Sequence, residues 1–239
     1  MDYQPPTYPD LIIFVRHAQS IGNTLSQEER AQLNTGTDAY NLTDLGREQA
    51  AITGEWLRKY YPDPDVILRS YYERTRETSD ILYPDHPKVD EALLTERDRG
   101  AWHVMTHAEM QTMMPWELVR RDRTNPFHFR PVGGESMADM ERRVREVRRS
   151  LRCNYPGKVV VMVGHAHWLM LLLKLTHRWT IEEMLTRLEA GSWAQNASVL
   201  LFRPGPINPA NGKQRLLHDP SVDLITPWEG ILKAGKALP

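Results

Sequence analysis

The residues of this chain whose types could do chemistry are two histidines and two arginines that follow short apolar runs. Arg16 and His17 end one such run, His165 ends another, and Arg74 lies shortly after a third. Two arginines make a poor metal site, because guanidinium groups are cationic and carboxylates are scarce beside them. They suit an oxyanion instead, since a guanidinium forks onto phosphate oxygens and stays charged at ordinary pH.

A neutral imidazole beside a bound phosphoryl group can attack phosphorus and form a phosphohistidine. Neighbouring arginines should disfavour the imidazolium form of that histidine, although bound phosphate acts in the opposite sense. A second imidazole can hold the group in its planar transition state, and the N–H groups that begin the helix after Ser70 add anion-binding capacity. A carboxylic acid must still protonate the departing alkoxide. These residue types therefore indicate phosphoryl transfer.

The segments that must position these residues are predicted to be alternating strands and helices. The runs 11–15, 65–68 and 158–164 are almost continuously apolar, which is typical of strands buried on both faces. Helices are expected at 42–61, with Thr43 as N-cap, at 70–82, where Ser70 and Glu73 have capping-box spacing, and at 107–121 and 136–153. A long loop is expected at 21–42, a short strand within 88–103, a final strand at 198–202 and an irregular tail from Pro204 onward.

This alternation predicts an α/β fold, a three-layer α/β/α sandwich with a mostly parallel central sheet. Residues 1–239 are expected to form a single domain, with a core at about 11–203 and the tail at 204–239. Ligands gather at the carboxyl ends of parallel strands. Three separate strands would therefore deliver the histidines and arginines to one edge of the sheet.

Six segments carry a resemblance, and they lie in order between residues 11 and 202: VRHAQSIGN, SYYERTRET, LLTERDRGAW, RPVGGES, VVVMVGHAHW and AQNASV. Together they resemble the motifs of the histidine phosphatase superfamily, the phosphoglycerate mutase-like proteins. The resemblance implies a nucleophile at His17 and a proton donor at Glu96. It further implies that phosphate is held by four residues, Arg16, Asn23, Arg74 and His165, the last of which is also catalytic.

Several positions depart from the family pattern or leave alternatives open. Ala18 and Ala166 replace usual glycines, which would matter if either backbone needed a positive φ. Gln19 stands where many members have glutamate. Arg76 competes with Arg74, and Asp98 competes with Glu96. His103 and His107 are either a metal-binding pair or surface residues, and His167 either lines the pocket or has a structural role. A basic segment either binds an anion or is an exposed loop; it contains Arg120, Arg121, Arg123, His128 and Arg130.

The resemblance leaves a choice between hydrolysis and transfer. Mutases of the family have a substantial insertion before the GES segment, whereas Glu96 and Gly134 here are only 38 positions apart, with one helix and a loop expected between them. A short cover lets water reach the phosphohistidine, so a phosphomonoesterase is favoured. The alternatives are a phosphoglycerate mutase, a sugar-bisphosphate phosphatase and, less favoured, a non-enzymatic scaffold that binds a phosphorylated ligand.

Composition narrows the expected partners and location. A formal net charge of −1 gives no bulk attraction to nucleic acid or an anionic membrane, so the expected partner is a phosphorylated small molecule. No metal or other cofactor is expected, because the arginines supply the positive charge. The single cysteine, Cys153, excludes an internal disulfide, and no signal peptide or 20-residue apolar span is evident, so a cytoplasmic location is predicted. The oligomeric state stays open, a dimer included.

Overall fold

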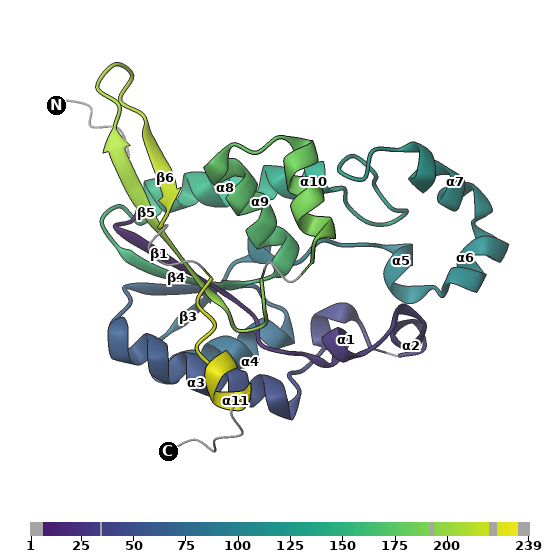
Figure 1. Cartoon of the computed structure of the whole chain (residues 1–239), viewed down its shortest axis with the longest axis horizontal. Coiled ribbons are helices and arrows are strands. Elements are labelled where there is room, and N and C mark those ends of the chain that lie inside the picture. The colour runs from purple at the N-terminus through teal and green to yellow at the C-terminus, as the bar shows by residue number, and fades with distance from the viewer. Residues whose placement is uncertain (1–6, 34, 192–193, 220–223, 234–239) are drawn as a thin grey trace.

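A computed structural model describes residues 7–33, 35–191, 194–219 and 224–233, and its centre is a six-stranded mixed sheet (Figure 1). The strand order is β3-β2-β4-β1-β5-β6. The strands are β1 (Leu11–Arg16), β2 (Val66–Arg69), β3 (Lys88–Asp90), β4 (Val159–Gly164), β5 (Val199–Ile207) and β6 (Gln214–His218). The first four are parallel to one another, while β5 and β6 are antiparallel additions. The predicted α/β fold with a mostly parallel sheet is confirmed.

Helices cover both faces of this sheet (Figure 1). One face carries α3 (Asp44–Tyr60) and α4 (Glu73–Leu82), and the other carries α8 (Met137–Asn154), α9 (Ala166–His177) and α10 (Ile181–Glu189). Strand β1 is buried on both faces: Ile12 and Phe14 pack in the α8–α9 layer, and Ile13 and Val15 in the opposite layer. That two-sided burial explains why its sequence is continuously apolar rather than alternating.

Side-chain caps fix where two of the predicted helices begin. The Thr43 hydroxyl accepts a hydrogen bond from the Gly46 N–H at 3.0 Å and starts α3. Ser136 and Asp139 cap each other reciprocally at the start of α8, whose buried stripe is the apolar series seen in the sequence. Both predicted helices are confirmed.

The loop predicted at 21–42 is wrong. It contains α1 (Ile21–Thr24), α2 (Gln27–Ala31) and the 3₁₀ helix η1 (Thr37–Ala39). A capping box between Ser26 and Glu29 satisfies one N–H at the start of α2, and the Asn23 side chain accepts from the Ser20 N–H at 3.0 Å at the start of α1. Such helices need no apolar periodicity, which is why none was visible.

The capping box predicted between Ser70 and Glu73 is also wrong. Helix α4 starts at Glu73, with Tyr72 as its N-cap and no side-chain cap bond. The Ser70 hydroxyl lies 3.0 Å from Nε2 of His165 instead. A tertiary contact has taken the hydroxyl that the local spacing assigned to the helix.

The segment between Glu96 and the GES motif is not the predicted helix and loop. After η2 (Ala92–Leu94) it forms α5 (Ala101–Val104), α6 (His107–Met113) and α7 (Pro115–Arg123), which extend to one side of the sheet in Figure 1. The helix predicted at 107–121 is interrupted at Met114, because Pro115 disfavours the helical conformation in the residue before it. Pro115 then serves as the first residue of α7.

The irregular tail from Pro204 onward is wrong as well. Strand β5 continues to Ile207, β6 pairs with it, and α11 (Glu229–Lys233) lies on the α3 face (Figure 1). Strand 198–202 is therefore not the final strand. A register shift between Pro204 and Ile207 accommodates residues without an N–H donor, since proline is tolerated at sheet edges and bulges. No helix within the described ranges is long and apolar enough to cross a bilayer.

Candidate active site

Three of the predicted site residues meet at the carboxyl edge of the parallel strands. His17 follows β1, Arg74 lies in the first turn of α4 after β2, and His165 follows β4 as the N-cap of α9. The Arg74 guanidinium spans the two rings: its Nε lies 3.2 Å from Nε2 of His17, and its Nη2 lies 3.2 Å from Nδ1 of His165. All three side chains are buried.

These contacts fix the tautomers of both imidazoles. A guanidinium only donates, so Nε2 of His17 and Nδ1 of His165 must each present a lone pair to Arg74. The other nitrogen of His17 then carries the proton and donates to the Ala18 carbonyl at 2.8 Å. The other nitrogen of His165 donates to the Ser70 hydroxyl. His17 therefore holds an unprotonated Nε2 at the edge of the cavity.

Burial and neighbouring charge keep both rings neutral. Burial first, and then the positive charge of Arg74, lower the pKa of His17 well below its usual value, with further contributions from His165 and Arg16. Burial and Arg74 also lower the pKa of His165, while Glu96 acts in the opposite sense. A neutral imidazole is the nucleophilic form, so the environment favours attack by His17 at neutral pH.

Arg16 and Asn23 are fixed through groups that leave donors for a ligand. The Arg16 side chain donates to the Ala194 carbonyl, and its Nε is buried without a hydrogen-bond partner in the described part of the chain. The Asn23 amide oxygen accepts from the Ser20 N–H at 3.0 Å and from Asn196 at 3.3 Å. With its oxygen engaged, Asn23 has its amide NH₂ left to offer an anion.

A cavity of about 200 Å³ joins these groups. Its described lining residues are Arg16, His17, Ser20, Gly22, Asn23, Arg30, Thr37, Tyr40, Arg74, Glu96, Arg97, Arg99, His103, Ala166 and His167. Several guanidinium groups and a single carboxylate therefore face one space. Such a lining suits a multiply charged anion.

Glu96 is the acidic residue of this cavity. Its carboxylate accepts from the Arg97 N–H at 2.8 Å and lies 3.3 Å from Nδ1 of His167. Burial alone would raise the pKa of Glu96, but His167 and the Arg97 N–H hold that pKa well below its usual value. The competing residue Asp98 is exposed and accepts from the Gly100 N–H at 2.7 Å, so it shapes the turn instead.

The segments around Glu96 are held by contacts between two sequence motifs. Arg143 of α8 bonds both carboxylate oxygens of Glu135 and donates to the Leu93 carbonyl at 2.8 Å. Gly100 has φ +51°, and a Cβ there would lie 2.1 Å from the Val132 carbonyl oxygen. The GES segment and the segment after Glu96 can approach so closely only because a glycine stands there.

Neither alanine that replaces a family glycine needs a positive φ, since the only non-glycine residues with one in the described ranges are Arg178 and Ala197. Ala18 is buried, and its N–H donates to the Thr78 hydroxyl at 3.0 Å. Gln19 ties the loop to α3, because its side-chain oxygen accepts from the Thr43 hydroxyl at 2.8 Å. The three departures are therefore compatible with the site geometry.

Of the other candidate residues, some line the cavity and others do not. Arg76 pairs with Asp90 at 2.6 Å and does not line the cavity. His103 lines it, whereas His107 begins a different helix and is exposed. In the basic segment, Arg120 pairs with buried Glu117, Arg130 pairs with Asp139, Arg123 and His128 are exposed, and Arg121 lines a second cavity. In the described ranges, no three His, Cys, Asp or Glu side chains are grouped to hold a metal ion.

Sequence reasoning missed several residues at or beside the cavity. Tyr72 does not line it but places its ring 4.7 Å from the Arg74 guanidinium, and burial, with a smaller effect of Tyr71, raises the pKa of Tyr72 to about 12. Arg30 comes from α2, in the segment predicted to be a loop, and Arg99 lies three positions after Glu96 in a segment without helical periodicity. No spacing signal marks these residues, because tertiary contacts alone bring them to the cavity.

The chain also matches known proteins. The family model of the histidine phosphatase superfamily (branch 1) covers residues 12–206. The bifunctional protein Rv2228c of Mycobacterium tuberculosis is 30% identical over 170 residues, which are 70% of this chain and 44% of that protein. The glucosyl-3-phosphoglycerate phosphatase of Mycolicibacterium vanbaalenii is 33% identical over 132 residues, 54% of each chain. The chain thus spans about half the length of these relatives.

The fold agrees with solved structures. Bacillus stearothermophilus YhfR superposes with a TM-score of 0.67 at 22% identity, covering 87% of this chain and 96% of that one. At this identity the likeness establishes the fold alone. The family match, which spans most of the chain, establishes more: this protein belongs to the histidine phosphatase superfamily, branch 1.

Proposed function

We propose that this protein hydrolyses phosphomonoesters of small molecules through a phosphohistidine formed on His17. The observation that carries the proposal is the unprotonated Nε2 of His17, presented beside Arg74 and His165 in a cavity lined by further arginines. The glucosyl-3-phosphoglycerate phosphatase among the relatives supports the same reaction class.

In the first step, the Nε2 lone pair of His17 attacks phosphorus and the bond from phosphorus to the ester oxygen breaks. Arg16, Arg74, Asn23 and His165 hold the phosphoryl oxygens, and the arginines stabilise the charge that builds up there. Glu96 gives a proton to the leaving alkoxide, which departs as an alcohol. The products of the step are that alcohol and phosphohistidine.

In the second step, water attacks the phosphohistidine. Glu96, now ionised, takes a proton from that water, the nitrogen–phosphorus bond breaks, and phosphate leaves. The electron pair returns to Nε2, so His17 regains the neutral form that its environment favours. Glu96 has its proton again, and the cycle closes.

The low pKa of Glu96 has to be reconciled with proton donation. Without a ligand, the contact with His167 favours the carboxylate form of Glu96. A bound phosphoryl group brings negative charge beside Glu96, which raises its proton affinity. Glu96 is therefore protonated when substrate is bound and can give its proton to the leaving group.

Hydrolysis is favoured over phosphoryl transfer to a second substrate. Only three short helices, α5 to α7, stand between Glu96 and the GES segment. The cover is therefore small, and water has access to the intermediate. We place the reaction in the cytoplasm, a proposal that rests on the composition and the single cysteine, Cys153.

The test is to trap the intermediate. Incubation with a ³²P-labelled phosphomonoester and rapid quenching should label the wild-type protein with an acid-labile, alkali-stable phosphoryl group, while His17→Ala stays unlabelled and inactive. Phosphate release should also be unaffected by EDTA and exceed transfer to an added alcohol. Full activity of His17→Ala would refute the mechanism, and transfer faster than release would make the protein a phosphotransferase instead of a phosphatase.

A further inference from the structure

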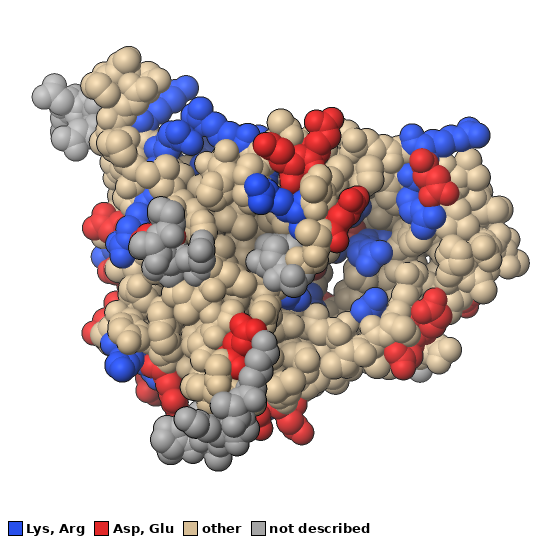
Figure 2. All heavy atoms as spheres, viewed as in Figure 1, with Lys and Arg blue, Asp and Glu red and all other residues tan. Residues whose placement is uncertain are grey.

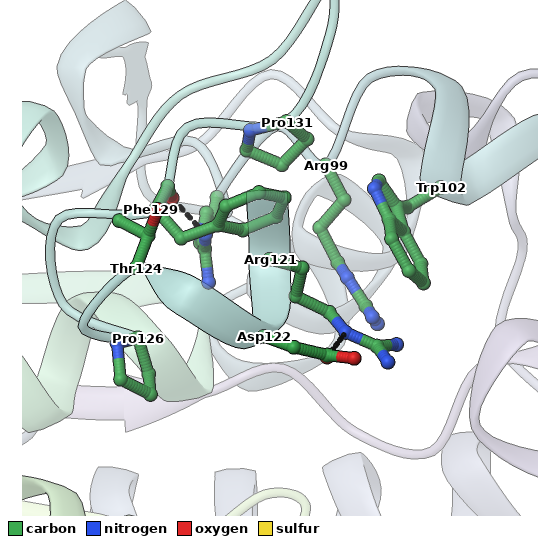
Figure 3. Close-up of a pocket in the computed structure, with 9 residues that line it drawn as sticks. Arg99, Trp102, Arg121, Asp122, Thr124, Pro126, Phe129 and Pro131 are labelled. Atoms are coloured by element: carbon green, nitrogen blue, oxygen red, sulfur yellow. Dashed lines mark hydrogen bonds and ion pairs between the residues drawn. The ribbon is translucent and has the colours of Figure 1, made fainter. Parts of the chain in front are cut away.

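A second cavity, of about 450 Å³, opens beside the one that contains His17. The two share Arg97 and Arg99 in their linings, so a ligand held at His17 has the larger space next to it. Figure 3 shows the larger cavity, with Arg99 and Arg121 directing their side chains toward the same end and Trp102 beside Arg99. The leaving group of a substrate bound at His17 can extend into this space.

The combined lining carries more positive charge than one phosphoryl group can balance. Among the described residues, six arginines line the two cavities (Arg16, Arg30, Arg74, Arg97, Arg99 and Arg121), against two carboxylates (Glu96 and Asp122). A phosphomonoester supplies at most about two negative charges. Roughly two positive charges therefore remain uncompensated after the phosphoryl group binds. Figure 2 shows a hollow on one face of the protein with Lys and Arg atoms in and around it and Asp and Glu atoms near its rim.

Arg99 and Arg30 carry part of this excess charge. The Arg99 guanidinium makes no hydrogen bond or ion pair with any residue in the described ranges. Burial, and then the positive charge of Arg30, lower the pKa of Arg99, with Glu96 acting in the opposite sense. Within the described ranges, Arg30 donates only to neutral carbonyls, those of Gly22 at 2.8 Å and Leu25 at 3.0 Å. Two half-buried cations held close together without a carboxylate partner are unfavourable unless an anion joins them.

The other arginines near the larger cavity have partners. Arg97 is held by the carbonyls of Glu135 and Phe129, each at 3.0 Å. Arg121 pairs with Asp122 at 2.8 Å. They shape the cavity, whereas Arg99 is free to bind a ligand.

We propose that the leaving group of the substrate carries a second anionic group, a carboxylate or a second phosphoryl group, and that Arg99 binds it with help from Arg30. The inference deepens the proposed function, on which it rests, by naming the substrate class: phosphomonoesters of acids or bisphosphates, in preference to phosphomonoesters of neutral alcohols.

Matched substrate pairs test the proposal. The first pair is 3-phosphoglycerate and glycerol 3-phosphate, in which a carboxylate replaces a hydroxymethyl group. The second is fructose 1,6-bisphosphate and fructose 6-phosphate. Wild-type protein should prefer the more anionic member of at least one pair by about tenfold or more in kcat/KM, since a hydrogen bond to a charged group is worth about that factor. The pair that shows the preference identifies the group as a carboxylate or a phosphoryl group.

Substitution assigns the preference to Arg99. Arg99→Gln should reduce kcat/KM for the preferred anionic substrate by about tenfold or more, mainly through KM, and for its neutral partner by much less. Arg123→Gln, an exposed arginine that lines neither cavity, should keep the preference. Equal losses for both members of the pair, or no preference in the wild type, would overturn the inference. If Arg99→Gln fails to fold, the wild-type preference and Arg30→Gln decide the matter.

Binding to the His17→Ala protein separates the two proposals. Calorimetry should give a dissociation constant about tenfold lower for the anionic member of the pair, whether or not the wild type hydrolyses it. Tighter binding without hydrolysis of any substrate, p-nitrophenyl phosphate included, would refute the phosphatase and keep the anion site. Hydrolysis of p-nitrophenyl phosphate with equal binding of both members would refute the anion site and keep the phosphatase.

Discussion

The guanidinium of Arg74 donates its Nε–H to Nε2 of His17 over 3.2 Å, so the lone pair of the proposed nucleophile faces a cation in the absence of a ligand. Burial and, after it, the charge of Arg74 lower the pKa of His17, and the contact places the proton on the opposite nitrogen, Nδ1. An arriving phosphoryl group competes for that guanidinium and can draw it away from the ring. In the proposed mechanism, Arg74 therefore keeps His17 neutral and also binds the phosphoryl group that His17 attacks.

Replacing Arg74 should impair binding and nucleophile activation together. Arg74→Gln removes a positive charge that binds phosphate, and its loss also raises the pKa of His17. We therefore expect KM to rise and kcat/KM to fall by about a hundredfold or more. Arg76→Gln, which removes a neighbouring arginine that pairs with Asp90 outside the cavity, should change kcat/KM by less than about threefold. Steady-state phosphate release at several pH values measures both. A larger effect at Arg76 would reverse the assignment.

The proton donor can be identified from leaving-group dependence. Glu96→Gln should slow hydrolysis of an alkyl phosphate by about 10²–10⁴-fold, because an alkoxide needs a proton. Hydrolysis of p-nitrophenyl phosphate should fall far less, since nitrophenolate leaves without one. Asp98→Asn serves as the control and should affect both substrates equally and weakly. Equal losses on the two substrates in Glu96→Gln would contradict general acid catalysis by this residue.

The buried histidines should make stability fall on acidification. The pKa values of His17 and His165 lie below the value of about 6.5 in the unfolded chain, so the unfolded state binds more protons below that pH. Above pH 6.5, the two neutral histidines do not lower the free energy of unfolding. Below that pH, each histidine lowers the free energy of unfolding by about 1.4 kcal/mol per pH unit, until the pH reaches its pKa in the folded state. Urea unfolding at pH 7.5 and 5.5 measures this loss. It should shrink in His17→Asn, and an unchanged loss would show that His17 is not the group responsible.

Substitutions at two glycines distinguish the cost of backbone strain from the cost of a steric clash. Gly100 and Gly157 both have positive φ, but only at Gly100 would a Cβ meet backbone, the Val132 carbonyl oxygen at 2.1 Å. Gly157→Ala should therefore destabilise the protein by about 1–2 kcal/mol. Gly100→Ala should destabilise it by more and also lower activity, because the segment after Glu96 must move. Thermal unfolding and phosphate release measure the two effects, and equal destabilisation would mean that the close approach is relaxed in solution.

Sequence alone determined the features that are set locally or by an ordered series of motifs. Continuous apolar runs predicted strands buried on both faces, and the 3.6-residue stripe of α8 with its Ser136 cap predicted that helix, because periodicity reports directly on burial. The rule that ligands bind at the carboxyl ends of parallel strands was enough to predict that His17, Arg74 and His165 converge.

Only the tertiary structure decided which polar groups engage one another. The Ser70 hydroxyl had local capping spacing, yet it serves His165, a residue 95 positions away. His167 faces Glu96, and Arg99 and Arg30 come from segments with no signal of a shared cavity. A side chain's charge can be read from the sequence, but the partner that balances it, or the lack of one, depends on long-range packing. For that reason the reaction class was predictable, whereas the anionic substrate proposed for Arg99 required the fold.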